Sequence, residues 1–137
     1  MAIEIRISTG SSVPIYRQLF DQFCRAVLTG ALGEGDQVPS VRTLAERLVV
    51  NPNTVARTYG ELIREGILEA RQGRGVFVAR RRLVYTKAER LRRVQEPLDA
   101  FVNRALLVGL TPGEIRGLLE EKLAVLEKEQ KGEDSHG

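Results

Sequence analysis

The stretch from Val38 to Val78 constrains the fold of this 137-residue chain most, because it carries its own start and stop signals. Ser40 stands where a helix N-cap is needed. Asn51 can cap a second helix with Pro52 at its first position, where no amide hydrogen is required, and Gly66 can end that helix. We therefore expect two short helices joined by a tight turn. The expected buried residues are Leu44, Ala45, Leu48, Val55, Tyr59, Leu62 and Ile63, and the expected outward residues of the second helix are Asn53, Thr54, Arg57, Thr58 and Glu61.

The hydrophobic period changes after the second helix. Residues 67–71 and 76–79 are typical of two short strands, and the connection between them contains Gly73, Arg74 and Gly75. Two glycines permit the positive φ values of a tight turn and place an arginine at its tip. The predicted fold class is therefore mainly α with a small β-hairpin wing, a winged helix-turn-helix. In that fold the second helix suits the major groove of DNA, and the wing suits the backbone or the minor groove.

These motifs also indicate a family. The run that begins at Pro39–Arg42 and ends at Gly73–Val78 resembles the GntR family of bacterial transcription regulators, and Val50–Arg57 is most similar to its YtrA branch and the related aminotransferase-fused branch. The likeness extends from about Pro14 to Val78, roughly half of the chain. The resemblance implies a homodimeric repressor in which a short helical dimerisation region follows the winged domain. It also implies operators that can include those of transporter genes.

Candidate DNA-contacting residues follow from the helix geometry and from the resemblance. Side chains at the start of the second helix can reach base edges, where Asn pairs with adenine and Arg with guanine. Two positions that hold base-reading arginines in the fatty-acid-responsive branch are Pro52 and Ala56 here, which leaves Arg57 as the nearest substitute. For each arginine a surface salt bridge is the competing interpretation. The full set is Arg42, Thr43, Asn51, Asn53, Thr54, Arg57, Arg71, Gly73, Arg74 and Gly75, with Arg47 as a lesser candidate.

The region after the wing predicts a helical dimerisation unit. Residues 80–95 hold seven Lys/Arg against one Glu, which places positive charge beside the expected DNA-binding face unless it is simply a solvated helix start. Capping boxes at Thr86 and Thr111 each open a helix. Pro97 indicates either a bend in the first of these helices, which we favour, or a junction between two helices. The expected dimerisation residues are Leu91, Val94, Leu98, Phe101, Ala105, Ile115, Leu119 and Leu126. An intramolecular helical hairpin is the alternative use of these apolar faces.

The segment before Val38 predicts a short strand and one helix. Residues 3–7 alternate between apolar and charged side chains, as a strand does. Residues 14–28 are typical of a helix that packs across the back of the other two and ends at Gly30. Cys24 has no catalytic partner in the sequence and is interpreted as a packing residue. The expected apolar side of the helix is Ile15, Leu19, Phe20, Phe23, Val27 and Leu28.

The domain boundaries and the function follow from these patterns. We expect a winged domain at residues 1–79, a helical dimerisation region at 80–130 and a flexible tail at 131–137. A single cysteine, a charged N-terminus and the absence of a long apolar run favour a cytoplasmic protein without a membrane span. The composition offers no catalytic set and no metal-ligating cluster, so we expect no enzyme activity, cofactor or metal. The expected partners are double-stranded DNA and a second copy of the chain. A small-molecule inducer and the alternative function, a winged-helix protein-interaction module, stay open.

Overall fold

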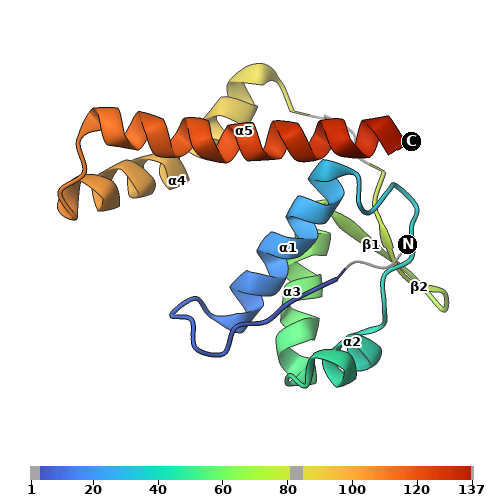
Figure 1. Ribbon diagram of the computed structural model, residues 1–137. Coiled ribbons are helices and arrows are strands. Elements are labelled where there is room, and N and C mark those ends of the chain that lie inside the picture. Colours follow the sequence, from blue (N-terminus) through green and yellow to red (C-terminus); the bar gives the residue numbers. More distant parts are fainter. Residues whose placement is uncertain (1–3, 81–84, 137) are drawn as a thin grey trace. The chain divides into compact units, whose positions relative to one another are not determined.

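The computed structural model describes residues 4–80 and 85–136. The chain divides into two compact units, residues 1–81 and 82–135, which are described separately. The first unit contains three helices and a hairpin, and the second contains two helices (Figure 1). The predicted fold class, mainly helical with a β-hairpin wing and a helical pair after it, is confirmed.

The first unit follows the order α1 (Ile15–Thr29), α2 (Val41–Leu48), α3 (Pro52–Arg64), β1 (Leu68–Arg71) and β2 (Gly75–Val78). The two strands are antiparallel, with Leu68 opposite Val78 and Arg71 opposite Gly75. The loop before α2 lies along the outer edge of β2, because the Val38 amide donates to the Val76 carbonyl at 2.9 Å and the Val78 amide donates to the Asp36 carbonyl at 2.8 Å. These bonds fix the wing to the start of the helix-turn-helix.

The hydrophobic core of the first unit lies between α1, α2, α3 and the hairpin. Tyr59 of α3 is buried, as the sequence predicted, and its ring meets Phe23 of α1 edge to face at 5.5 Å. Its hydroxyl donates to the Pro39 carbonyl at 2.6 Å, and burial raises the pKa of that phenol. A satisfied buried hydroxyl at this position ties α3 to the segment that opens α2. The core comprises Leu19, Phe23, Leu32, Val38, Leu44, Ala45, Val55, Tyr59, Leu62, Leu68 and Val78.

The two capping predictions at the helix-turn-helix are confirmed. The Ser40 hydroxyl accepts from the Thr43 amide at 3.1 Å, and the Asn51 side-chain oxygen accepts from the Asn53 amide at 2.8 Å. The turn between the helices is closed by Val49, whose φ of 55° and ψ of 51° lie in the left-handed region. A β-branched residue in that region is a conformational outlier. The sequence showed a turn here but not its conformation.

The predicted N-terminal strand is wrong for the residues that the structure describes, since residues 4–7 form no strand and Ile3 lies outside them. Polar side chains of α1 take the place of a partner strand. The Arg6 amide donates to the Gln22 side-chain oxygen at 3.0 Å, and the Gln22 amide group donates back to the Arg6 carbonyl at 2.7 Å. The Gln18 side chain holds Ser8 in the same way. With both backbone groups satisfied from the helix, no strand is needed.

Three side chains of the first unit differ in burial from what the helical periodicity predicted. Thr58 was expected to point outward but is fully buried, because its hydroxyl donates to the Thr54 carbonyl at 2.9 Å and contacts the Tyr16 carbonyl at 3.5 Å. Ile63 and Leu28, expected to be buried, are exposed. Both lie near the ends of their helices, where fewer neighbours cover them. The helix α1 was predicted to pack across both other helices; its packing against α3 is confirmed, whereas α2 packs mainly against α3 rather than against α1.

The second unit consists of α4 (Lys87–Leu107) and α5 (Pro112–His136). The predicted capping box at Thr111 is confirmed, since Thr111 and Glu114 are bonded reciprocally at 3.0 and 3.1 Å. At Thr86 the structure shows the hydroxyl half of the predicted box, with the Thr86 hydroxyl accepting from the Glu89 amide at 3.2 Å. Pro97 lies inside α4, so the alternative of two helices meeting there is wrong. The helix α5 continues to His136 and so includes most of the tail at residues 131–137, whose flexibility stays a prediction. Glu, Lys and Gln are good helix formers, and the run Lys128–Lys131 carries the helix forward.

Most of the predicted dimerisation residues are exposed. Leu91, Val94, Leu98, Phe101 and Leu119 each leave between 42% and 53% of their surface open to solvent. Ile115 and Leu126 are half-buried. Ala105 is buried. We call this row of predicted dimerisation residues on α4 and α5 the seam. The two helices therefore present a large apolar surface that their own packing does not cover.

Candidate nucleic-acid interface

The start of α3 presents the polar side chains that the sequence predicted as base contacts. Asn51 and Asn53 are exposed, and Thr54 is half-buried. Asn51 uses its side-chain oxygen for the helix cap, which leaves its amide group as a donor. The exposed carboxamide of Asn53 offers both a donor and an acceptor at the helix start. That pattern can pair with the edge of an adenine.

Arg57 lies one turn further along α3 and is not a free side chain. Its guanidinium carbon stands 3.9 Å from the centroid of the Tyr16 ring on α1. Its Nε atom lies 3.8 Å from a carboxylate oxygen of Glu61, one turn on. The side chain nevertheless remains 60% exposed. Arg57 is therefore exposed, as predicted, and also forms the salt bridge of the competing interpretation. Its contact with Tyr16 was not predicted from the sequence.

Arg42 and Thr43 lie in the first turn of α2. Arg42 forms an ion pair with Glu46 at 3.3 Å, and both side chains are highly exposed, at 89% and 70%. An exposed pair of this kind contributes about 0–1 kcal/mol, so a phosphate can replace Glu46 at little cost. Thr43 is half-buried, and its hydroxyl oxygen accepts from the Ser40 hydroxyl at 2.9 Å. Thr43 is therefore a structural residue of the cap as well as a candidate contact.

The wing places one arginine in its turn and one at the end of β1 beside the turn. Arg74 takes part in no ion pair within the described residues, and its backbone closes the turn by donating to the Arg71 carbonyl at 2.9 Å. Arg71 is held by Glu69 at 2.7 Å and stacks on Phe77, with 4.2 Å between the guanidinium carbon and the ring centroid. Gly73 has a φ of 74°. Arg74 is thus the more available of the two wing arginines.

Gln37 supports the wing tip, a role that no sequence pattern indicates. Its side-chain amide donates to the Arg74 carbonyl at 3.0 Å. A Cβ added to Gly75, whose φ is 120°, would stand 2.6 Å from that amide nitrogen. Gly75 is therefore needed both for its conformation and for the close approach of Gln37. This contact holds the backbone of Arg74 in place.

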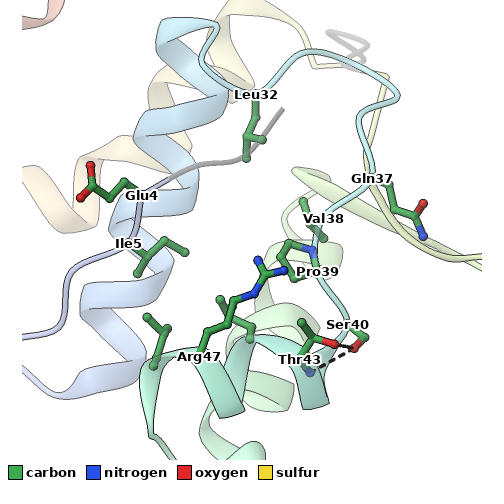
Figure 2. A pocket seen from close by; sticks show the side chains of 11 residues that line it. Glu4, Ile5, Leu32, Gln37, Val38, Pro39, Ser40, Thr43 and Arg47 are labelled. Atoms are coloured by element: carbon green, nitrogen blue, oxygen red, sulfur yellow. Dashed lines mark hydrogen bonds between the residues drawn. The ribbon is translucent and has the colours of Figure 1, made fainter.

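Arg47, the lesser candidate, lines a hollow of about 710 Å³ between α2, the loop before it and residues 4 and 5. Figure 2 shows its guanidinium directed over Pro39 and Val38 into this hollow. The lining is mixed, with Ile5 and Leu32 supplying apolar surface. Arg47 is nevertheless an exposed residue, so its place in the hollow does not remove it from solvent.

The basic segment after the wing lies partly outside the described residues. Arg81 and Arg82 belong to the range 81–84, which the structure does not describe. In the second unit the guanidinium carbon of Arg93 stacks 3.9 Å from the Tyr85 ring centroid, and Arg90 and Arg92 are exposed. None of the described helices is both long and apolar enough to cross a bilayer.

Comparison with known proteins gives a consistent result. Residues 15–78 match the family described as "Bacterial regulatory proteins, gntR family". The chain is 37% identical over 106 residues to the HTH-type transcriptional repressor YtrA of Bacillus subtilis, covering 77% of this chain and 82% of that protein. A Listeria monocytogenes structure described as a transcriptional antiterminator superimposes with a TM-score of 0.80 at 30% identity, over 90% of this chain and 92% of that one. YtrA from Sulfolobus acidocaldarius, a GntR-family transcription factor, gives 0.59 at 32% identity, over 75% and 97%.

A winged helix-turn-helix with an exposed polar helix start and an arginine-tipped hairpin is the architecture of a DNA-binding transcription regulator, and the comparisons agree. The alternative of a protein-interaction module receives no support from them. The chain belongs to the GntR family of bacterial regulatory proteins, and it is similar to the YtrA branch of that family.

Proposed function

We propose that the protein is a homodimeric repressor that binds an operator of two half-sites. The proposal rests on the presence of two different exposed surfaces in one chain. The first unit exposes polar side chains at the start of α3, and the second exposes an apolar seam along α4 and α5. One surface suits the major groove and the other suits a second copy of the chain.

The proposed base contacts are made by Asn53, Thr54 and Arg57, with Asn51 beside them. The helix start presents them together, and Asn and Arg are the residue types that pair bidentately with adenine and guanine. Arg42 and Arg74 are the proposed phosphate or minor-groove contacts, because both are exposed and Arg74 carries no competing ion pair among the described residues. Thr43, Arg71, Gly73 and Gly75 are proposed to support these contacts at the edge of the interface.

The proposed dimer forms through the seam of the second unit. Leu91, Val94, Leu98 and Phe101 follow one another at helical steps on α4 and are each about half exposed. Exposed apolar surface of this extent is unusual on a monomer and marks an interaction site. A two-fold dimer would set the two copies of α3 about 34 Å apart, or a multiple of that distance, along one face of the duplex.

The proposed mode of action is occupancy of promoter DNA, without catalysis. The Bacillus subtilis relative is named as a repressor, and occupancy alone is enough to repress. We propose a bacterial cytoplasm as the compartment, because that is where a bacterial regulator meets DNA. An inducer is compatible with this scheme, and neither a cofactor nor a metal is required by it.

The experiment that tests the proposed function is selection of bound duplexes from a random pool, followed by gel shifts of the selected duplex at two salt concentrations. We expect a palindromic motif, and an affinity that falls steeply as salt rises because each neutralised phosphate releases counterions. A selected motif without two-fold symmetry would refute the dimeric operator. Failure to enrich any duplex would refute the function itself.

A further inference from the structure

We propose that Tyr16 of α1 is a positioning residue for sequence recognition, because its ring holds the guanidinium of Arg57 in the orientation used to read a base. The inference rests on the proposed base contact of Arg57. It adds a residue from outside the helix-turn-helix to the determinants of specificity.

The geometry of the pair is that of a face contact. The guanidinium carbon of Arg57 lies 3.9 Å from the centroid of the Tyr16 ring. Arginine stacks on aromatic faces through the flat side of its planar group, whereas its N–H donors point outward from the edge. A stack on Tyr16 therefore occupies one face and leaves the edge for hydrogen bonds. The 60% exposure of the Arg57 side chain agrees with an accessible edge.

Glu61 gives Arg57 a second contact, from one turn further along α3. Its carboxylate oxygen lies 3.8 Å from Nε of Arg57, so the ion pair is directed at the inner nitrogen. The two terminal nitrogens are left for a partner. Those terminal nitrogens form the fork that matches the O6 and N7 acceptors of guanine. Tyr16 and Glu61 together restrict the side chain without occupying the fork.

The backbone of α1 at Tyr16 packs against the recognition helix α3. The hydroxyl of Thr58, which follows Arg57 in α3, contacts the Tyr16 carbonyl at 3.5 Å and is fully buried. One turn along α1, Leu19 is buried in the core. The ring therefore stands on a backbone that is tied to the same turn of α3 that carries Arg57. Movement of Arg57 relative to the ring is limited by this packing.

The energetic role follows from side-chain entropy. A free arginine loses much rotamer freedom when it binds, and a side chain held near its bound orientation loses less. Loss of the ring should therefore weaken binding to the correct sequence more than binding to random DNA, where Arg57 has no guanine to read. A purely structural role for Tyr16 would weaken both equally.

The test compares Tyr16→Leu, Tyr16→Gln and Tyr16→Phe by gel shift with the selected duplex and with a random duplex of equal length. We expect Tyr16→Leu and Tyr16→Gln to reduce the ratio of specific to random affinity by about three- to tenfold, the range of one stacking contact. Tyr16→Phe, which keeps the ring, should stay within about twofold of the wild type. The matched control is Tyr85→Leu, which removes an arginine stack of the same 3.9 Å spacing from the second unit and should leave the ratio unchanged.

The double variant Tyr16→Leu with Arg57→Ala separates the two proposals. If Tyr16 acts through Arg57, removing the ring should have no further effect on the ratio once Arg57 is alanine. An equal loss in both backgrounds would overturn the positioning role and leave the base contact intact. An unchanged ratio in Arg57→Ala alone would overturn the base contact and the positioning role together.

A measurement on the wild-type protein keeps the proposal testable should the leucine and glutamine variants unfold. The ring current of a stacked tyrosine shifts the side-chain proton resonances of Arg57, and NMR can follow them in the free protein and in the complex with the selected duplex. We expect the shift in both states. Its disappearance on binding specific DNA would overturn the proposal, because the ring would then release Arg57 and not position it.

Discussion

Replacing Val49 by glycine should stabilise the first unit. Val49 is the one non-glycine residue with positive φ among the described residues, and its conformation lies in the left-handed region at φ 55° and ψ 51°. That region costs an L-residue about 1–2 kcal/mol. The side chain is 89% exposed, so its removal sacrifices little apolar burial. Glycine also has greater freedom in the unfolded chain, which lowers the free energy of unfolding by about 0.5–1 kcal/mol.

The net expectation for Val49→Gly is a rise of about 0.5–1 kcal/mol in the free energy of unfolding. For a unit of this size that corresponds to an increase of about 2–8 °C in the melting temperature. Thermal unfolding followed by circular dichroism at one fixed protein concentration measures it, since dimerisation makes the melting temperature depend on concentration. The matched control is Val49→Ala, which keeps a Cβ and should gain much less. A lower melting temperature for the glycine variant would refute the assignment of strain to this turn.

Three further predictions concern the DNA, the seam and a helix cap. Arg74→Ala should weaken binding to selected and random duplexes alike. It should also reduce the slope of log affinity against log salt concentration by about one unit, as removal of one phosphate contact does. An unchanged slope would show that the wing tip does not contact the DNA. Leu98→Asp should convert a sedimenting dimer to monomers, and a persistent dimer would show that the seam lies elsewhere. The pKa of Glu114 is lowered from 4.5, first by the hydrogen bond from the Thr111 backbone amide and then by one from the Thr111 side chain. The bond between the Thr111 amide and the Glu114 carboxylate should therefore be fully formed above about pH 4.5 and weaken as the pH falls through the lowered pKa. An NMR titration in which Glu114 titrates at or above 4.5 would contradict that cause.

Local signals in the sequence were enough to predict the elements that depend on neighbouring residues. The caps at Ser40, Asn51 and Thr111 satisfy backbone donors within three residues, so the spacing of the residues specifies them. The hairpin follows from the glycines that flank Arg74 for the same reason. The burial of Tyr59 follows from its place on the helical stripe.

Contacts between distant parts of the chain could not be predicted in this way. The stack of Arg57 on Tyr16 joins residues 41 positions apart, and the burial of Thr58 depends on a carbonyl of the same distant helix. Gln37 holds the wing through a hydrogen bond to the Arg74 carbonyl, which periodicity does not report. In each case two elements had to be placed against each other before the role of the side chain became visible.

The alternation of residues 3–7 shows how a correct pattern can give a wrong element. Ile5 and Ile7 do pack against the core while Arg6 faces away, as a strand would arrange them. Alternation reports which side chains turn inward, but a strand also needs a partner for its backbone. Here Gln22 and Gln18 of α1 supply that partner, so the segment stays extended without joining a sheet.

The most direct test of the central claim is protection of guanine N7 atoms from methylation in a selected duplex bound by the protein. N7 lies in the major groove, where the start of α3 is proposed to bind. We expect two protected patches on one face of the duplex, about one helical turn or a multiple of a turn apart. A bound duplex with no protected N7, or with one patch only, would contradict the claim that two copies of α3 read the major groove.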